Sequence, residues 1–358
     1  MTLQIKKNIL KKGLDIVGKS VSSKNIIPII SYVLFSVKEG KLSISANNLD
    51  SSIVTTVEDG RASDGFKATV EFKKLNDVVS KLSGDEITMW EQGGMMEIVS
   101  GKNKFKLKTL PVEDFPDAPV KNELIFSIET SKLLKSIAYT SFATSTEAIK
   151  PALTALSIKL MDGKMEAVGT NGHRLAMITQ DIDFKGEEQL LIPATSLTEV
   201  ARLANLIKPD KISFYRSRKN IVIEVGGTVY TTRTIEANYP NYNAVIRNDI
   251  AEGIVINRQE LFQEIQVVDT VDADVLKLSL KNGTLGVSAE NKEDNAVAEG
   301  SIWLEYKGEP IEAEFNIKYL TDMLRNVTMD KFSIDMRNEG ATIIYGADYK
   351  YLLMPLKG

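Results

Sequence analysis

A chain of 358 residues is too long for a single ordinary hydrophobic core and fits two or three domains. Its composition, 43% hydrophobic and 26% charged, is typical of a folded globular protein and excludes a disordered chain. The formal net charge of -4 excludes a protein that grips nucleic acid over its whole surface, but it leaves room for one basic face.

Two further absences in the sequence narrow the class of protein. There is no cysteine, which excludes disulfides, thiolate metal sites and cysteine nucleophiles and fits a reducing compartment. No apolar run approaches the roughly 18 residues that a membrane helix needs, and the first residues lack the apolar core of a signal peptide. We therefore expect a cytoplasmic protein.

The first predicted helix has a strongly basic face. Residues 6–24 contain six lysines and a single acid, Asp15, a local charge of +5. Lys12 and Lys19 point nearly opposite to the apolar stripe of this helix, which comprises Leu10, Leu14, Val17 and Val21. A charge run of this kind usually marks a solvated face. Its contrast with an acidic chain also fits a loose attraction to phosphate that does not depend on base sequence.

Further along, the chain repeats itself three times. Predicted helices recur at a period of about 122 residues, each followed by a polar turn and an alternating strand. Their apolar stripes contain Leu75, Val78, Val79 and Leu82, then Leu197, Val200 and Leu203, then Leu320, Leu324 and Val327. Glycine, an alternating strand and a terminal asparagine recur at 40–48, 163–171 and 283–291, and similar strands close the units at 105–111, 230–236 and 349–355.

These repeats predict three similar domains of the α+β class. Each copy is expected to run strand, helix, three strands and then strand, helix, three strands, giving antiparallel sheets with two helices on one face. Proline-rich turns at 113–123 and 237–249 are typical of linkers. We place the domains at 1–121, 122–249 and 250–358.

The first helices of the second and third copies differ in charge. In the helix from about Ser131, we expect Lys132 and Lys135 to point outward, and the residues expected inward are Leu134, Ile137 and Ala138. The helix from about Arg258 lies among acids, namely Glu260, Glu264, Asp269, Asp272 and Asp274. A basic lining built from these helices would therefore be uneven.

Catalytic chemistry finds little support in the sequence. The single histidine, His173, has no evident orienting partner, and a lone histidine is more often structural than catalytic. No Ser/His/Asp set, HExxH motif, phosphate-binding loop or GxGxxG is present, and acid pairs such as Glu290 with Asp294 are weak signals. We expect no enzyme, no metal site and no cofactor.

The segment TNGHRLA at 170–176 resembles the TDGHRLA signature of the bacterial DNA sliding clamp, the beta subunit of DNA polymerase III. The resemblance covers the whole chain and includes the stretch 26–44, FPDAP at 115–119, YPNYNAV at 239–245 and the terminal MPLKG at 354–358. Only the GHRL segment is specific by itself, but the motifs occur in the family's order on a threefold repeat. The resemblance implies a ring-shaped processivity factor that encircles duplex DNA and tethers the replicative polymerase.

In that family, a hydrophobic groove between the second and third domains binds short peptides of the polymerase, the clamp loader ATPase and repair factors. The matching groove residues here are Leu153, Thr170, Gly172, His173, Arg174, Leu175, Pro240, Val245, Leu352, Met354, Pro355 and Leu356. His173 and Arg174 would supply polar edges to an apolar slot. Without the resemblance, the same residues would read as a turn and a final strand.

The resemblance also implies DNA contacts and a homodimer. Lys24 and Lys150 match basic loop positions and join Lys12 and Lys19 as DNA-contacting candidates, although Pro151 and Ala152 replace two tyrosines found in some clamps. The signature departs from the family at Asn171, where aspartate is usual. Two chains would close head to tail into a six-domain ring, with interface residues Lys73, Lys74, Lys104, Phe105 and Leu107 facing Glu293 and Asp294.

Two other interpretations stay open. A nucleic-acid enzyme would need a metal-binding carboxylate cluster. A monomeric or decoy relative would bind the same peptides without encircling DNA, and its solution mass would distinguish it from a ring.

Overall fold

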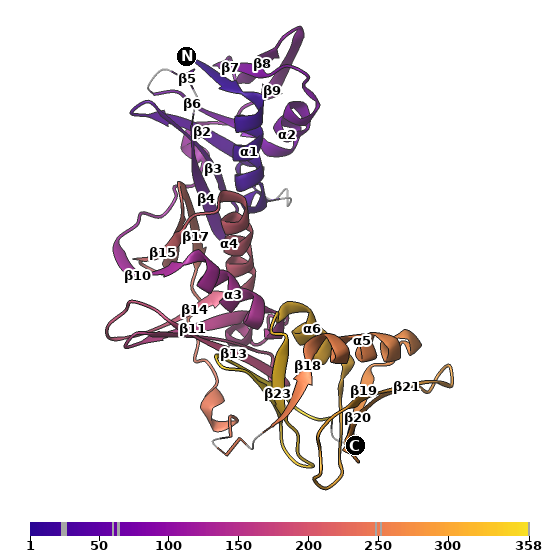
Figure 1. Cartoon of the computed structure of the whole chain (residues 1–358). Helices are drawn as coiled ribbons and strands as arrows, with labels where there is room; N and C mark the ends of the chain where they lie inside the picture. The colour runs from indigo at the N-terminus through magenta and orange to yellow at the C-terminus, as the bar shows by residue number, and fades with distance from the viewer. Residues whose placement is uncertain (23–26, 59–60, 63–64, 248, 251–252, 357–358) are drawn as a thin grey trace. The chain divides into compact units, whose positions relative to one another are not determined.

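The computed structural model of the chain describes residues 1–22, 27–58, 61–62, 65–247, 249–250 and 253–356 (Figure 1). The chain packs as two compact units. Unit 1 contains Met1–Thr130 and Thr195–Thr234, and unit 2 contains Ser131–Ala194 and Ile235–Gly358. Among the described residues, no helix is both long enough and apolar enough to cross a membrane.

Unit 1 is built on two antiparallel sheets. The first has the strand order β5-β1-β7-β8-β9, and the second has the order β10-β15-β16-β17-β4-β3-β2-β6. Its strands are β1 Thr2–Lys6, β2 Tyr32–Lys38, β3 Lys41–Asn47, β4 Ser51–Val57, β5 Arg61–Ala62, β6 Lys67–Glu71, β7 Glu86–Gln92, β8 Met95–Ser100, β9 Asn103–Lys108, β10 Glu123–Glu129, β15 Lys211–Ser217, β16 Asn220–Val225 and β17 Thr228–Arg233. Its helices are α1 Lys7–Val17, α2 Phe72–Lys81 and α4 Ala194–Ile207, with 3-10 turns at Gly18–Ser20, Pro28–Ser31 and Val112–Asp114.

Unit 2 repeats this plan with sheets of eight and four strands, ordered β14-β11-β12-β13-β25-β24-β23-β18 and β21-β20-β19-β22. Its strands are β11 Ala155–Met161, β12 Lys164–Thr170, β13 Arg174–Asp181, β14 Glu187–Pro193, β18 Ile254–Asn257, β19 Val275–Lys281, β20 Thr284–Asn291, β21 Ala296–Trp303, β22 Ile311–Asn316, β23 Lys331–Asp335, β24 Thr342–Tyr345 and β25 Tyr349–Leu353. Its helices are α3 Thr130–Thr140, α5 Arg258–Val268 and α6 Ile317–Asn326, with 3-10 turns at Ser141–Ala143, Pro151–Thr154, Tyr242–Ala244 and Asp269–Val271.

The element order confirms the threefold repeat and the α+β class. Each copy runs strand, helix, three strands and again strand, helix, three strands, with the two-residue β5 as an addition in the first copy. Strand pairs from different copies join the large sheets: β4 pairs with β17 in unit 1, and β13 pairs with β25 in unit 2. The middle copy therefore contributes strands to both units, which is why neither unit coincides with one repeat.

Helix α1 packs closely on strands β3 and β4 of the eight-stranded sheet of unit 1. Its stripe of Leu10, Leu14 and Val17 is fully buried as predicted, whereas Val21 lies beyond the helix end and is half-buried. A Cβ on Gly13 would lie 2.7 Å from Ile44 Cδ1, and one on Gly18 would lie 2.6 Å from Phe72 Cζ. Gly13 costs helix propensity but lets the backbone approach β3, and Gly18, just beyond the helix end, lets it approach α2.

The buried face of helix α3 differs from the prediction. Ile137 is buried as expected, but Leu134 and Ala138 are only half-buried, and the buried residues of the helix are Leu133, Ser136, Ile137, Tyr139 and Thr140. Ser136 Oγ donates to Lys132 O at 2.8 Å, and Thr140 Oγ1 donates to Ser136 O at 2.6 Å. Because the helix itself satisfies both hydroxyls, these residues can face the core. A prediction from the apolar residues alone therefore does not identify the buried face of α3, which includes Ser136 and Thr140.

Candidate functional site

The turn between β12 and β13 carries the segment that the sequence singled out. Asn171 Oδ1 accepts hydrogen bonds from the backbone N–H groups of His173, at 2.9 Å, and Arg174, at 3.1 Å. Gly172 has φ +93°, a conformation that other residues rarely adopt, and its N–H donates to Thr170 Oγ1 at 3.1 Å. An asparagine offers the same acceptor oxygen as an aspartate, so the departure at Asn171 leaves this turn intact.

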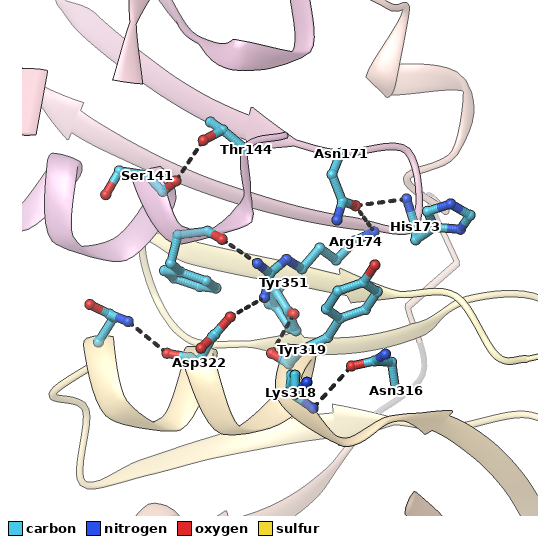
Figure 2. A network of polar contacts seen from close by, with 12 residues as sticks. Ser141, Thr144, Asn171, His173, Arg174, Asn316, Lys318, Tyr319, Asp322 and Tyr351 are labelled. Atoms are coloured by element: carbon cyan, nitrogen blue, oxygen red, sulfur yellow. Dashed lines mark hydrogen bonds and ion pairs between the residues drawn. The ribbon is translucent and has the colours of Figure 1, made fainter. Parts of the chain in front are cut away.

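Arg174 lies inside unit 2 and does not form a polar edge (Figure 2). Its Nη1 donates to Asp322 Oδ2 of α6 at 2.8 Å, and its Nη2 donates to the carbonyl oxygen of Phe142. The guanidinium carbon lies 4.5 Å from the ring centre of Tyr319 and 5.5 Å from that of Phe142. With only 8% of its surface exposed, Arg174 joins β13 to α6, whereas His173 is exposed and points away from this network.

Behind the turn lies an apolar floor. Leu175 of β13 pairs with Leu352 of β25, and both are buried in one cluster with Val168, Met177, Tyr242 and Ile343. Tyr242 donates to Glu166 Oε1 at 2.5 Å and Tyr239 donates to Val168 O at 3.0 Å. Burial raises the pKa of both tyrosine hydroxyls, so both remain protonated donors near neutral pH. These bonds anchor the segment 239–245 over the floor.

Three of the predicted groove residues have exposed apolar side chains. Val245, Met354 and Leu356 keep 52%, 42% and 43% of their surface exposed. Met354 N donates to His173 O at 3.0 Å, and Leu356 N donates to Glu314 O at 2.8 Å, so the end of the chain is anchored at two backbone points. Pro240 is exposed and Pro355 half-buried, whereas Leu153 and Thr170 are buried. The predicted set thus divides into buried members, of which Leu175 and Leu352 form the floor, and exposed apolar members, which we call the margin.

The sequence prediction missed several members of this region. Tyr239, Tyr242, Met177 and Ile343 belong to the floor or its cover, and the two tyrosines of the YPNYN motif were the available signal. Asp322 and Tyr319, which hold Arg174, lie almost 150 residues away and carry no sequence signal.

The predicted DNA-contacting lysines are found in different surroundings. Lys12, Lys19 and Lys150 are exposed, and Lys24 lies outside the described residues. On α3, Lys132 and Lys135, which were predicted to point outward, are half-buried and have partners: Lys135 Nζ pairs with Asp348 Oδ2, and Lys132 Nζ donates to Asp181 O at 3.0 Å. Both cations have partners within unit 2, so α3 presents less free positive charge than the sequence indicates.

The predicted interface residues of unit 1 lie on α2 and on β9, an edge strand of its five-stranded sheet. Phe105 and Leu107 are half-buried on one side of β9 and alternate with exposed lysines. Lys104 and Lys106 bind Glu97 at 2.7 and 2.8 Å, and these contacts lower the pKa of that carboxyl group. On α2, Lys74 pairs with Glu71 at 2.7 Å and Lys73 is exposed.

The predicted acids of the third repeat lie in the turn between β20 and β21. Asn291 Oδ1 accepts the N–H groups of Glu293, at 3.0 Å, and Asp294, at 3.2 Å, which fixes this turn at the start of β21. Strand β21 is an edge of the four-stranded sheet. Within the part of the chain that the structure describes, no three His, Cys, Asp or Glu side chains are grouped so as to hold a metal ion.

Three copies of one α+β fold, joined through shared antiparallel sheets, define the class of DNA sliding clamps. Models of the N-terminal, central and C-terminal domains of the DNA polymerase III beta subunit match residues 1–119, 127–241 and 243–356, and the chain belongs to this family.

Known relatives match this chain from end to end. The beta sliding clamp of Pseudomonas aeruginosa is 29% identical over the full length of both chains. A crystal structure of the DNA polymerase III subunit beta from the same organism superposes with a TM-score of 0.92 at 27% identity, again over both whole chains. A sliding clamp from P. aeruginosa bound to griselimycin gives a TM-score of 0.90 at 27% identity and covers 100% of this chain and 99% of that one.

Proposed function

We propose that two copies of this chain close into a ring around duplex DNA and hold the replicative polymerase on it without catalysing any reaction. The observation that carries the proposal is the family match over all three repeats, with no repeat missing. Within this proposal the clamp domains are 1–121, 122–249 and 250–358. The protein works in the cytoplasm, without a cofactor.

The groove of the proposal is the floor around Leu175 and Leu352 together with its exposed margin. Val245, Met354 and Leu356 offer an adaptable apolar surface for a short peptide, and His173 offers a hydrogen-bonding edge. The floor below is fixed by the tyrosine and Arg174 contacts, so little ordering is needed on binding. Peptides of the polymerase, the clamp loader ATPase and repair proteins are the proposed ligands.

Tethering then follows from topology. A ring has no free end, so weak phosphate contacts through Lys12, Lys19, Lys24 and Lys150 leave it mobile along DNA without letting it escape. A polymerase bound in the groove stays near its template at a high effective concentration, and processivity needs no chemical step.

Ring closure is proposed to join β9 of one protomer to the third repeat of the other. An edge strand has unpaired N–H and C=O groups, and β9 adds Phe105 and Leu107 as apolar anchors. The lysines Lys73, Lys74 and Lys104 would face Glu293 and Asp294 of the other protomer. Lys74 and Lys104 already have acidic partners in their own chain, so the apolar pair carries most of the proposed contact.

Exchanging Phe105→Ala together with Leu107→Ala is expected to dissociate the dimer, because a few apolar anchors dominate most interfaces. Mass photometry at nanomolar concentration should show monomers for this variant and dimers for the unmodified chain. Lys108→Ala, an exposed position on the same strand, is the control and should stay dimeric. A double variant that remains fully dimeric would remove β9 from the interface. An unmodified chain that is monomeric would favour the decoy function instead.

Direct binding to linear duplex DNA is expected to be weak, independent of sequence and steeply dependent on salt. Lys12→Ala with Lys19→Ala should reduce the slope of log K against log salt by about 2, one for each lost phosphate contact. Exchanging the exposed Lys38 and Lys41 of the β2–β3 hairpin is the matched control and should leave the slope unchanged. Clamps loaded on circular DNA should survive salt that abolishes direct binding. Tight, sequence-selective binding to linear DNA would argue against encirclement.

A further inference from the structure

Unit 1 contains a pocket of about 500 Å³ on the face of its large sheet opposite to α1. Residues of β2, β3 and β4 form its floor, and the segment 112–118 forms one wall. The floor residues are Leu34, Ser45, Asn47, Ser52 and Val54. A volume of this size is within the range of sites that bind small molecules or peptide side chains.

The turn beside this pocket has the same frame as the TNGHR turn of unit 2. Asn48 Oδ1 accepts the N–H groups of Asp50, at 3.1 Å, and Ser51, at 2.8 Å, as Asn171 Oδ1 accepts those of His173 and Arg174. Asn48 N also donates to Ser51 O, as Asn171 N donates to Arg174 O. Ser51 therefore occupies the position of Arg174, and Ser52 occupies that of Leu175.

The strand pairing extends this equivalence across the sheet. Ser52 of β4 pairs with Thr231 of β17, as Leu175 of β13 pairs with Leu352 of β25. The segment FPDAP passes over the first position as YPNYN passes over the second: Phe115 is buried like Tyr242, and the side chain of Asn47 reaches Pro116 O at 3.5 Å. The pocket is thus the counterpart, in the first repeat, of the floor described in unit 2.

The two floors differ in chemistry at equivalent positions, while Leu34 and Val54 keep part of the unit 1 floor apolar. Val168 and Leu175 belong to the floor in unit 2, and the corresponding lining residues of the unit 1 pocket are Ser45 and Ser52. Ser52 is only 4% exposed, and its hydroxyl group has no hydrogen-bond partner among the described residues. A buried hydroxyl without a partner loses its hydration without compensation, so a ligand that bonds to it recovers that loss.

We propose that this pocket is a second recognition site, which takes a short peptide segment anchored by an uncharged amide side chain and rejects the apolar anchors of the groove. A primary amide offers two donors and an acceptor in one flat group, which suits a floor of hydroxyl and amide groups that both donate and accept. An apolar anchor would cover the Ser45 and Asn47 side chains and would offer no partner to Ser52 Oγ, which disfavours its binding.

Charged residues at the mouth of the pocket do not determine which side chain it binds. The charged lining residues are Glu113, Asp117 and a single cation, Lys67, and all three are exposed. Charged side chains at an exposed mouth contribute little to affinity, so selection rests on the uncharged floor. The proposal does not depend on the groove, because the pocket lies wholly in unit 1 and the groove residues lie wholly in unit 2.

The test titrates two capped tripeptides, acetyl-Ser-Gln-Ser-amide and acetyl-Ser-Leu-Ser-amide, into the full-length chain at millimolar concentration. Binding is followed by the NMR signals of the Val54 methyl groups. The glutamine peptide should bind and the leucine peptide should bind at least tenfold more weakly. Ser52→Ala should weaken the glutamine peptide about fivefold, the effect of one neutral hydrogen bond.

Controls keep the outcome unambiguous. Ser43→Ala changes a hydroxyl on the same face of β3, outside the pocket, and should leave both affinities unchanged. Because Ser52 Oγ has no partner to lose, Ser52→Ala should fold with an unchanged melting temperature and bind groove peptides normally. Equal binding of the two tripeptides, no binding by either, or an affinity insensitive to Ser52→Ala would each overturn the proposal.

Discussion

Deleting Met354–Gly358 should weaken the binding of a glutamine-leucine-aromatic peptide about 30- to 1000-fold, which corresponds to about 2–4 kcal/mol. The deletion removes Met354, Pro355 and Leu356, of which Met354 and Leu356 have exposed apolar side chains and are proposed to line the groove. The measurement is a titration of the labelled peptide into the unmodified and truncated chains, with the dimer mass checked in parallel. The dimer should persist, because Phe105 and Leu107 lie in unit 1.

The controls for this deletion separate side-chain contacts from backbone damage. The deletion also removes the bonds from Met354 N to His173 O and from Leu356 N to Glu314 O, which can fray β25. Met354→Ser with Leu356→Ser keeps both backbone bonds and should still lose most of the affinity. Pro355→Ala is the milder comparison and should lose least. Unchanged peptide affinity in an intact truncated dimer would place the groove elsewhere.

Arg174→Ala should lower the free energy of unfolding of unit 2 by about 2–3 kcal/mol. It leaves the carboxylate of Asp322 without its partner and empties the space between the Tyr319 and Phe142 rings. The expected loss is at the lower end for a buried pair, because the Asp322 side chain is 37% exposed and water can solvate it again. Urea unfolding followed by hydrogen exchange of the β13 and α6 amides measures the loss locally.

Arg325→Ala is the matched control for Arg174→Ala. Arg325 is an arginine in the last turn of α6 itself, but its side chain is exposed, and removing it should cost less than about 1 kcal/mol. If Arg174→Ala were no more destabilising than Arg325→Ala, the network in Figure 2 would not hold β13 to α6. Peptide affinity should fall along with stability, since the floor residue Leu175 follows Arg174 directly.

The sequence predicted those features that depend on local order along the chain. Helical spacing located the stripe of Leu10, Leu14 and Val17, and the three repeated segments predicted the strand and helix order of every copy. The turn chemistry at Asn171 and Gly172 could also be read from the sequence, because short polar side chains and glycine act within a few residues of themselves.

Predictions from local sequence patterns failed where a side chain bonds to its own helix or where the pairing partner of a strand is distant in sequence. On α3, Ser136 and Thr140 bond to carbonyl groups of their own helix and can be buried, which turns the core face away from Leu134 and Ala138. The register of the closing strands was also missed. Aligning the repeated segments 230–236 and 349–355 from their first residues matches Tyr230 with Tyr349. The sheet register instead sets Thr232 opposite Ser51 and Leu353 opposite Arg174, which makes Tyr230 equivalent to Tyr351.

The sequence by itself determined the threefold repeat, the α+β class and the motifs that place the chain among sliding clamps. Only the tertiary structure decided that Arg174 lies buried against Asp322, that Lys132 and Lys135 are already paired, and that an apolar floor in unit 2 has a polar counterpart around Ser52. The reason is physical. Periodicity and turns reflect interactions within one element, whereas burial, ion pairing and strand register depend on residues that are distant in sequence.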